Sequence, residues 1–319
     1  MKNLVKHVQD VNSQKKMWQP TDIIVVGVSG GPDSMCMVDV LRRIAQKTEV
    51  TIIIAHVNYG LRGNDSINDE KLVQEYALKY NIDYEVFVCE DASEGSENQW
   101  RDIRYNFFKK VLAKYDANKI AVAHTKNDQA ETLLGHLIRG SGLQGLSGMR
   151  FCSENNIIRP LLSALRKDVL KYCDEQKISY NIDKTNEDTI FMRNRLRREL
   201  IPGIAKSYNS KIIETLASTA MTIADDYDFL KTVQKEFWTS KKDYITFSAD
   251  DFLLRHPSQQ RLALRTIIEQ LRGSLVDIES SFIEEMRKVI SSTKNKHQVI
   301  YTKDLKMMKN NDTVELMKL

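Results

Sequence analysis

A glycine-rich turn near the N-terminus holds the residues whose types and spacing are best suited to chemistry. The segment Gly27-Val28-Ser29-Gly30-Gly31-Pro32-Asp33-Ser34 follows a short apolar run and precedes a stretch of helical period. Small residues let backbone N–H groups approach an anion, and the N-terminus of the following helix adds partial positive charge. The turn therefore predicts a phosphate-binding loop. It is not a Walker A loop, because that motif requires a lysine that is missing here.

Three interpretations of this turn compete. Residues 27–31 fit the pattern G-x-S-x-G, in which Ser29 would be the nucleophile of a hydrolase. Such an enzyme also needs an acid and a later histidine, and short glycine patterns arise easily by chance. Residues 29–34 match the SGGxDS loop of the PP-loop ATP pyrophosphatases at every fixed position, and we favour this resemblance. A glycine turn without a chemical role is the third interpretation.

The resemblance to PP-loop enzymes implies a nucleotide and a metal. It implies that Ser29, Gly30, Gly31 and Ser34 hold phosphates. It also implies that Asp33 helps to hold a Mg²⁺ ion that bridges them. ATP brings about four negative charges, and a carboxylate beside them requires a cation between. ATP and Mg²⁺ are therefore the expected cofactors.

The elements around the turn alternate between two kinds of apolar pattern. Four continuous apolar runs suit strands that are buried on both faces, at 23–28, 51–57, 84–88 and 120–123. Between them, apolar residues recur with helical spacing in 35–44, 72–80 and 103–112. This strict alternation predicts an α/β fold with a doubly wound parallel sheet and right-handed crossovers.

The pattern changes after Pro202. Long helices are predicted over 212–237, 252–271 and 282–290, and only the end resembles strands, with a possible hairpin built from 298–301, a turn at Asn310 and Asn311, and 314–317. A chain of 319 residues exceeds the usual size of one core. We therefore predict a catalytic α/β domain over residues 1–205 and a second, mainly helical domain over 206–319.

Composition sets broad limits on the class of protein. The apolar fraction of 42% and charged fraction of 28% are ordinary for a globular protein, and no run approaches the roughly 18 apolar residues that a membrane span needs. The four cysteines lie far apart without a CxxC pair, which favours reduced thiols over a zinc site or disulfides. We expect a cytoplasmic protein. The net charge of +4 is too small to indicate a nucleic-acid partner, but residues 193–198 concentrate four arginines.

Segments at the predicted strand ends narrow the family. The sequences HVNYGLR at 56–62 and AHTKNDQAET at 123–132 lie where open α/β sheets bind ligands. They resemble the HVxHxLR and AHHxDDQxET motifs of tRNA(Ile)-lysidine synthases. Residues 137–149, 159–162 and 183–197 resemble that family's RGSGLxGLxGM, RPLL and DxSN…RNxxR segments. The chain is thus similar to this family in five ordered motifs over residues 23–202.

The resemblance implies a two-step ligase reaction on the wobble cytidine of tRNA(Ile) with a CAU anticodon. ATP first adenylates the base with release of pyrophosphate, and the ε-amine of L-lysine then attacks C2 with release of AMP, so that the tRNA reads AUA. The expected partners are this tRNA and L-lysine, without a membrane. The target base must leave its anticodon stack before it can react. The second domain is expected to contact tRNA. A homodimer is left open.

The resemblance also implies roles for individual residues. The predicted catalytic residues are Asp33, Asp128, Asp183, Arg193 and Arg197. The predicted nucleotide-binding residues are Ser29, Gly30, Gly31, Pro32, Asp33, Ser34, Ala55, His56, Arg139 and Gly140. Asp33 and Asp128 are the predicted metal ligands. Asp183 either takes a proton from the lysine ε-ammonium or pairs with it, and the two arginines stabilise the AMP leaving group or the tRNA backbone.

Each of these assignments has a structural alternative. Asp128 can cap a helix over 129–138. His56 and His124 can be satisfied by backbone groups at strand ends. Arg139 can be an ordinary surface charge, and the arginines of 193–198 can form a solvated helix face.

Four positions depart from the family motifs. Asn58, Tyr59, Thr125 and Asn127 replace two acids and two histidines, and an Asn accepts a hydrogen bond but brings no charge to a metal. These departures motivate a rival interpretation, a nucleotide-binding module without catalysis. A tRNA 2-thiolation enzyme is a second rival, but the kind that carries a metal cluster needs cysteine pairs that are absent here.

Overall fold

The computed structural model divides the chain into two compact units. It describes residues 3–61, 63–89, 96–153, 155–182, 192–275, 278–293, 297–302 and 304–319. The first unit comprises Met1–Gly135 and Gly148–Ala220, and the second comprises His136–Ser147 and Met221–Leu319. The division falls within helix α10 (Ile212–Val233). The predicted domain boundary near residue 205 stays a prediction.

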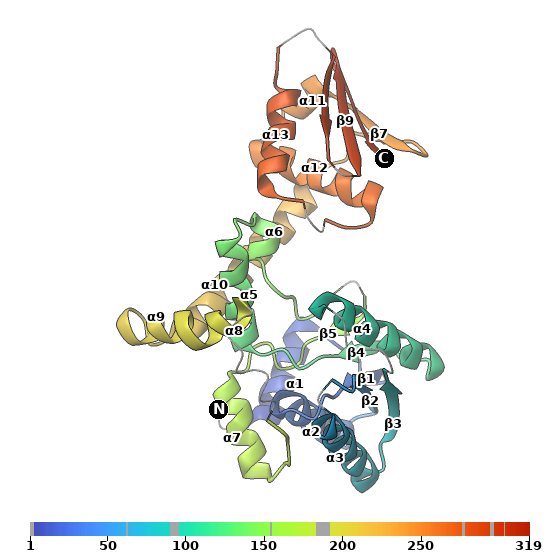
Figure 1. Cartoon of the computed structure of the whole chain (residues 1–319), viewed down its shortest axis with the longest axis vertical. Coiled ribbons are helices and arrows are strands. Elements are labelled where there is room, and N and C mark those ends of the chain that lie inside the picture. Colours follow the sequence, from blue (N-terminus) through green and yellow to red (C-terminus); the bar gives the residue numbers. More distant parts are fainter. Residues whose placement is uncertain are drawn as a thin grey trace. The chain divides into compact units, whose positions relative to one another are not determined.

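The first unit is built on a five-stranded parallel sheet in the order β3-β2-β1-β4-β5 (Figure 1). Its strands are β1 (Ile23–Gly27), β2 (Thr51–Asn58), β3 (Asp83–Val88), β4 (Lys119–Ala121) and β5 (Ile157–Ile158). Helices α2 (Pro32–Ala45), α3 (Asn64–Tyr80) and α4 (Glu97–Lys114) connect the first four strands. The predicted doubly wound α/β fold is therefore confirmed. The strand order reverses between β1 and β4, and such a switch point is where ligands bind in open sheets.

Both faces of this sheet are buried, which explains the continuous apolar runs. Ile24 and Val26 of β1 pack in one core cluster with residues of α1 (Leu4–Lys15), α2, α3 and α7 (Arg166–Gln176). Val25, between them, packs in another cluster with Phe108 and Val111 of α4. Alternate side chains of a strand point to opposite faces, so a strand covered on both sides must be apolar throughout.

Further helices surround the sheet. Helix α5 (Lys126–Ile138) follows β4. Helix α8 (Met192–Arg195) continues through a π-helical turn, Leu196–Leu200, into α9 (Ile201–Ser207). Pro202 lacks an N–H and its ring would clash with the carbonyl group of Arg198 in a regular α-helix, which accounts for the wider turn before it.

The second unit combines helices with a five-stranded antiparallel sheet in the order β6-β7-β10-β9-β8. Its strands are β6 (Thr239–Ser240), β7 (Tyr244–Ser248), β8 (Gln298–Tyr301), β9 (Leu305–Asn310) and β10 (Thr313–Lys318). Helices α11 (Ala249–Leu253), α12 (Pro257–Arg272) and α13 (Ser280–Ile290) pack against it through a core that includes Phe252, Ile267 and Val314. The predicted strands at 298–301 and 314–317 are present as β8 and β10, but they do not pair with each other: β10 forms its hairpin with β9, a strand that the sequence analysis did not predict, and β8 pairs with the other edge of β9.

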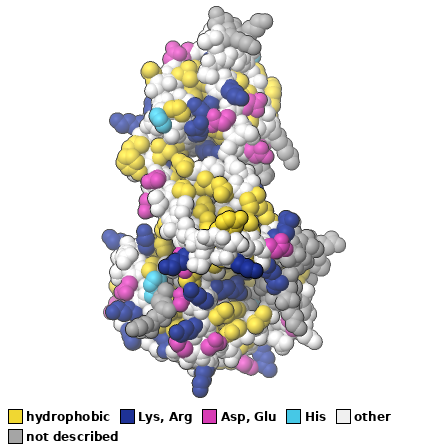
Figure 2. Space-filling view, turned by 90° about the vertical axis from the view of Figure 1, so that its left-hand side faces the viewer, with side chains coloured by type: hydrophobic (Ala, Val, Ile, Leu, Met, Phe, Trp, Pro, Cys, Tyr) yellow, Lys and Arg dark blue, Asp and Glu magenta, His cyan; other side chains and the backbone are white. Residues whose placement is uncertain are grey.

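The surface of the molecule carries mixed charge. Lys and Arg side chains are spread over the face shown in Figure 2, with Asp and Glu side chains among them. This agrees with the modest net charge of +4. Among the described residues, no helix is both long enough and apolar enough to cross a membrane.

Candidate active site

The phosphate loop connects β1 to α2 at the switch point of the sheet. The backbone N–H of Val28 donates to the carbonyl oxygen of Ala55 at 3.0 Å, which continues the pairing of β1 with β2 into the loop. A side chain at Gly27 would force the Phe108 ring to move, because a Cβ there would lie 2.6 Å from it. Gly31 precedes α2 without a side-chain cap, and Pro32 begins the helix. The first turn of α2 thus presents the partial positive charge that favours an anion.

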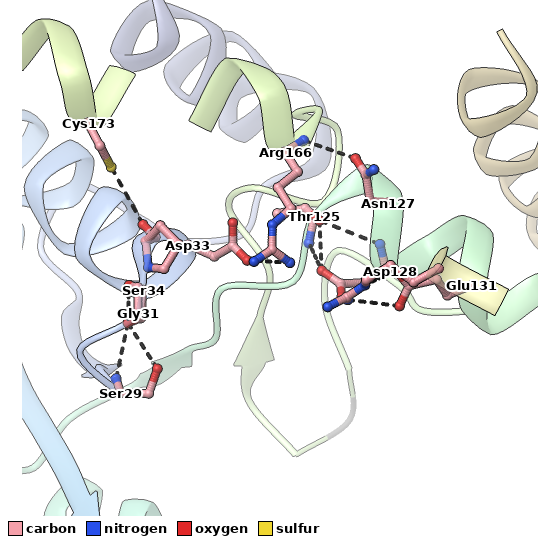
Figure 3. Close-up of polar contacts among 12 residues, drawn as sticks. Ser29, Gly31, Asp33, Ser34, Thr125, Asn127, Asp128, Glu131, Arg166 and Cys173 are labelled. Carbon is pink, nitrogen blue, oxygen red and sulfur yellow. Dashed lines mark hydrogen bonds and ion pairs between the residues drawn. The ribbon is translucent and has the colours of Figure 1, made fainter. Parts of the chain in front are cut away.

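Two serine hydroxyl groups fix the shape of this loop. The Ser34 hydroxyl accepts the backbone N–H of Ser29 at 3.1 Å and donates to the carbonyl oxygen of Gly31 at 2.9 Å (Figure 3). It also lies 3.2 Å from the Ser29 hydroxyl. Among the described residues, the polar side chain in contact with the Ser29 hydroxyl is therefore another serine and not a histidine. This contact favours the phosphate loop over a hydrolase nucleophile.

Gly30 contacts Asp69 and Asn181, two residues that the sequence analysis did not identify. Its φ angle is +87°, and a Cβ would lie 3.0 Å from Oδ1 of Asp69 on α3. Asn181 donates its backbone N–H to the carbonyl oxygen of Gly30 at 3.0 Å and its side-chain amide to Asp69 at 2.7 Å. Only glycine adopts this backbone conformation readily at such a close contact.

Asp33 lies in the first turn of α2 and points toward Arg166, the first residue of α7 (Figure 3). The Arg166 Nη1 atom lies 3.6 Å from Oδ2 of Asp33. Burial raises the pKa of Asp33 from 3.8 to about 6, although the charge of Arg166 opposes the rise. Oδ1 of Asp33 is buried and has no hydrogen-bond partner among the described residues. A buried carboxylate oxygen without a donor suits a cation that bridges to phosphate.

Asp128 belongs to the cap of α5, which begins at Lys126 and not at residue 129. The Thr125 backbone N–H and hydroxyl both donate to Oδ2 of Asp128, at 2.8 and 2.7 Å. Thr125 stands at the N-cap position and Asp128 three residues later, as in a capping box. Thr125 therefore has a structural role at the position where the family motif has a histidine.

The other oxygen of Asp128 joins a network of two acids and two arginines. Arg193 donates to Oδ1 of Asp128 at 2.7 Å and to Glu131 at 2.9 Å. Arg197 donates to Oδ1 of Asp128 at 3.2 Å and to Glu131 at 2.6 Å. The Glu131 side chain is only 2% exposed. We call these four residues the acid–arginine network.

The network keeps Asp128 ionised. Burial raises the pKa of this carboxyl group, but the charge of Arg193 and the two hydrogen bonds from Thr125 outweigh burial, so the pKa is lowered. The pKa of Arg197 is raised, because its bonds to Glu131 outweigh its own burial. The arginines of residues 193–198 are thus not only a solvated face, since two of them reach buried carboxylates.

The remaining departures from the motifs also have structural contacts. The Asn58 amide donates to Glu70 at 2.8 Å and accepts the Gly60 backbone N–H at 2.9 Å. The Tyr59 hydroxyl donates to the carbonyl oxygen of Trp100 at 2.9 Å. Oδ1 of Asn127 accepts the backbone N–H of Arg166 at 2.9 Å, so it caps α7 and helps to position the arginine beside Asp33.

Two histidines lie at the ends of parallel strands. His56 is 2% exposed, and its Nδ1 atom lies 2.8 Å from the carbonyl oxygen of Val28, directly beneath the phosphate loop. His124 follows β4, and burial lowers its pKa to about 3, so it is neutral at physiological pH. His56 therefore has a backbone partner, as expected if its role is structural. Its predicted role, like that of Ala55, in nucleotide binding stays a prediction.

The remaining predicted site residues are Arg139, Gly140 and Asp183. Arg139 and Gly140 belong to the second unit and are exposed. Asp183 lies outside the described residues, as does most of the motif that contains it. The sequence analysis did not predict the contacts made by Glu131, Arg166, Asp69 and Asn181. Only Glu131 carried a signal, because it follows Asp128 by three residues and such residues share one face of a helix.

Fold and phosphate loop together define a PP-loop nucleotide-binding protein. A family model described as the PP-loop domain matches residues 2–204. The tRNA(Ile)-lysidine synthase of Clostridium tetani is 38% identical over 83% of this chain and 59% of that protein. The enzyme of the same name from Clostridioides difficile is 30% identical over 93% of this chain and 67% of that protein. The chain belongs to the tRNA(Ile)-lysidine synthase family.

The chain matches only part of the length of the first of these relatives. This chain spans 59% of the length of the Clostridium tetani relative and 52% of that from Clostridium acetobutylicum, which is 36% identical. Among solved structures, a U34-tRNA thiolase from Methanococcus maripaludis is 17% identical with a TM-score of 0.55, over 75% of this chain and 82% of that one. This second likeness shows a shared fold only.

Proposed function

We propose that the protein ligates L-lysine to C2 of the wobble cytidine of tRNA(Ile) with a CAU anticodon. ATP adenylates the base, and pyrophosphate and AMP are the by-products. The main support from the structure is one juxtaposition: the phosphate loop after β1 and the acid–arginine network after β4 flank the switch point of the sheet. Nucleotide activation and amine transfer need an anion site and an ammonium site side by side.

The first step requires neutralisation of phosphate charge. The backbone of residues 29–34 and the N-terminus of α2 would hold the phosphates, while the cytidine O2 attacks the α-phosphate. The buried Oδ1 of Asp33 fits a Mg²⁺ ion, which would supply charge neutralisation between the phosphates when bound. Both oxygens of Asp128 already accept hydrogen bonds, so as the second predicted ligand it would exchange an arginine for the metal.

The second step requires a positioned and deprotonated amine. Asp128 and Glu131 are carboxylates at the carboxyl edge of the sheet, and the lowered pKa of Asp128 makes it a weak base but a strong partner for an ammonium group. We therefore assign Asp128 to binding of the lysine ε-ammonium. Asp183 stays the residue predicted either to take the proton of the ε-ammonium group or to pair with it. Arg193, 42% exposed, and Arg197 would stabilise the departing AMP or the tRNA backbone.

One experiment tests the proposal. The protein is incubated with ATP, Mg²⁺, radiolabelled L-lysine and unmodified tRNA(Ile), with elongator tRNA(Met) as the control. Label should enter tRNA(Ile) only when ATP is present, with one AMP released per lysine. Nucleotide binding without label in the tRNA would support the inert module instead. The contacts of Asn58 and Asn127 already weaken that rival, because both residues have a structural role.

A further inference from the structure

Helices α2 and α7 lie side by side and run in the same direction. In the first turn of both, Asp33 of α2 lies 3.6 Å from Arg166 of α7, and in the last turn of both, Arg43 of α2 donates to Gln176 of α7 at 2.7 Å. The two helix N-termini are therefore neighbours at the phosphate loop. Parallel helices bring their partial positive charges together at this end, and an anion placed there compensates both.

Arg166 adds a full positive charge at the same place, in a loose ion pair. Its contact with Asp33 measures 3.6 Å, whereas a charge-assisted N–H···O bond usually measures about 2.7–2.9 Å. The arginines of the acid–arginine network reach Glu131 at 2.9 and 2.6 Å. Within the described part of the chain, Arg166 forms no second ion pair, and its side chain is 30% exposed. The Arg166 side chain is thus weakly held and open to an incoming ligand.

The backbone of Arg166, in contrast, is firmly held by the start of α5. Oδ1 of Asn127 accepts the Arg166 backbone N–H at 2.9 Å (Figure 3). The backbone N–H of Lys126 donates to the carbonyl oxygen of Ala164 at 2.8 Å, just before α7. A fixed backbone with a loosely held side chain lets the guanidinium group change its partner without movement of the helix.

We propose that Arg166 is a catalytic residue of the first step, in which it leaves Asp33 and binds the pyrophosphate group of ATP. Asn127 is the residue that positions it. The inference rests on the proposed function. A guanidinium group presents several N–H donors to phosphate oxygens and neutralises negative charge that grows on the leaving group. The same exchange frees Oδ2 of Asp33, beside its unpartnered Oδ1, for a cation.

The step to which Arg166 contributes is a displacement at the α-phosphorus. A bond forms from the cytidine O2 to this phosphorus, while the bond from the phosphorus to the α,β-bridging oxygen breaks. The bridging oxygen takes the electron pair and leaves as part of pyrophosphate, and the adenylated base carries the resulting positive charge. Arg166 acts on the leaving oxygen atoms, and no proton transfer is assigned to it.

A purely structural role for Arg166 would have the opposite effect on binding. If the arginine only neutralised Asp33, its removal would leave the carboxylate free for the cation and would strengthen the binding of ATP with Mg²⁺. If the arginine binds the pyrophosphate group, its removal weakens ATP and pyrophosphate binding and leaves AMP binding nearly unchanged. The direction of the change therefore separates the two roles.

Calorimetry with ATP, inorganic pyrophosphate and AMP, each in the presence of Mg²⁺, tests the inference. Arg166→Gln should bind ATP and pyrophosphate about tenfold to a hundredfold more weakly than the native protein, whereas AMP binding should change little. Arg166→Lys keeps the charge without the planar group and should recover part of the loss. Lys167→Gln removes an exposed charge from the next residue and should bind all three ligands like the native protein.

The positioning role of Asn127 is tested in two backgrounds. Asn127→Ala alone should weaken pyrophosphate binding about threefold to tenfold. In Arg166→Gln the same change should have no further effect, because a positioning residue acts only through the side chain that it positions. Equal losses in both backgrounds would contradict this role, since they would show damage that does not pass through Arg166.

Each remaining outcome also decides between the roles. Unchanged or tighter binding of ATP and pyrophosphate by Arg166→Gln would overturn the inference. An equal loss of AMP binding would do the same, because it would assign Arg166 to the α-phosphate or to the fold. These measurements need neither tRNA nor L-lysine. Arg166-dependent pyrophosphate binding without ligation would refute the proposed function alone, whereas ligation with an ATP affinity independent of Arg166 would refute the inference alone.

Discussion

Two carboxylates of the first unit have pKa values shifted in opposite directions by their surroundings. Burial raises the pKa of Asp33 to about 6, whereas Arg193 and Thr125 overcome burial and lower that of Asp128. Such divergence separates a group that changes charge near neutral pH from one that stays ionised. The charge of Asp33 therefore depends on what binds next to it, while that of Asp128 is fixed by the protein itself.

Asp33→Asn should stabilise the nucleotide-free protein at neutral pH. The folded pKa of about 6 exceeds the usual value of 3.8, so ionised Asp33 destabilises the fold as pH rises through this interval. An uncharged Asn removes the penalty. We expect a gain on the order of 2 to 3 kcal/mol at pH 7.5 that vanishes near pH 4, measured by urea unfolding. The nearby charges of Arg166 and Asp128 are the same in both proteins.

The same variant should lose pyrophosphate release with ATP and tRNA(Ile), because the cation would lack its carboxylate. Opposite effects on stability and activity are typical of a residue kept for function. Equal stability of the two proteins at both pH values would show that Asp33 is not desolvated.

At the level of single residues, the sequence indicated which residues belong to the candidate site but not which side chains they contact. The loop at 29–34 and Asp128 were singled out by their resemblance to family motifs. Arg166 was not, because it comes from α7, whose approach to α2 depends on tertiary packing. Thr125 and Asn127 were read as departures from a motif. Their structural roles as helix caps follow from hydrogen bonds that a motif comparison does not consider. The bond between Thr125 and Asp128 is local, whereas that between Asn127 and Arg166 spans 39 residues.

Glu131 connects helix α5 to the arginines that follow α8 and should be needed for their placement. Glu131→Gln would remove one of the two acids of the acid–arginine network that pair with Arg193 and Arg197. We expect a loss of about 2 kcal/mol in the free energy of unfolding, a modest value because both arginines are partly exposed. The exposed Glu199, on the π-helical turn, gives the control variant Glu199→Gln, which should unfold like the native protein.

Asp39 joins three helices through one buried carboxylate. It is 1% exposed and accepts hydrogen bonds from Tyr172 of α7 at 2.7 Å, from Tyr76 of α3 at 2.8 Å and from Arg42 and Arg43 of α2 at 2.6 and 2.7 Å. Burial opposes its ionisation, but these bonds prevail and its pKa is lowered. The residue thus holds α7, and with it Arg166, against the helix of the phosphate loop.

Asp39→Asn should destabilise the protein by about 3 kcal/mol at pH 7, because two guanidinium groups lose their buried anion. The folded pKa lies below the unfolded value of 3.8, so this stabilisation is present above that pH and is lost as pH falls through the folded pKa. Thermal unfolding of the variant beside the exposed-site control Asp10→Asn measures the difference. The difference in stability between Asp39→Asn and the control should become smaller as pH falls. A difference that stayed constant would contradict the assigned role of the Asp39 charge.

At the level of elements, long apolar runs were predicted and short ones were missed. Strands β1 and β2 are continuous apolar runs that are buried on both faces, a pattern that few other elements show. Strand β5 has only two residues and exists through its pairing with β4. Strand β7 shows the alternation of Ile245 and Phe247 expected of a half-buried strand, but it is short and lies between the predicted helices 212–237 and 252–271. The predicted helix over 252–271 is interrupted before Pro257, which begins α12.

For the whole molecule, chain length and the change of pattern after Pro202 predicted two domains but not the path of the chain between them. The second unit takes His136–Ser147 from the middle of the sequence, a discontinuity that no linear pattern indicates. The glycine-rich motif of that segment was read from the sequence as nucleotide-binding. Its assignment to the second unit follows from contacts between residues far apart in the chain, which lie beyond the reach of local periodicity.

The central position of β1 affects the order in which the protein forms. Its neighbour β4 comes late in the chain: the Ile23 backbone N–H donates to the side chain of Asn118, 95 residues away. Closing so long a loop is entropically unfavourable until other contacts have formed, so this pairing should come late in folding. The phosphate loop after β1 and the acid–arginine network after β4 would then come together only near the end of folding. A nucleotide should accordingly slow unfolding of the finished protein and leave the refolding rate nearly unchanged.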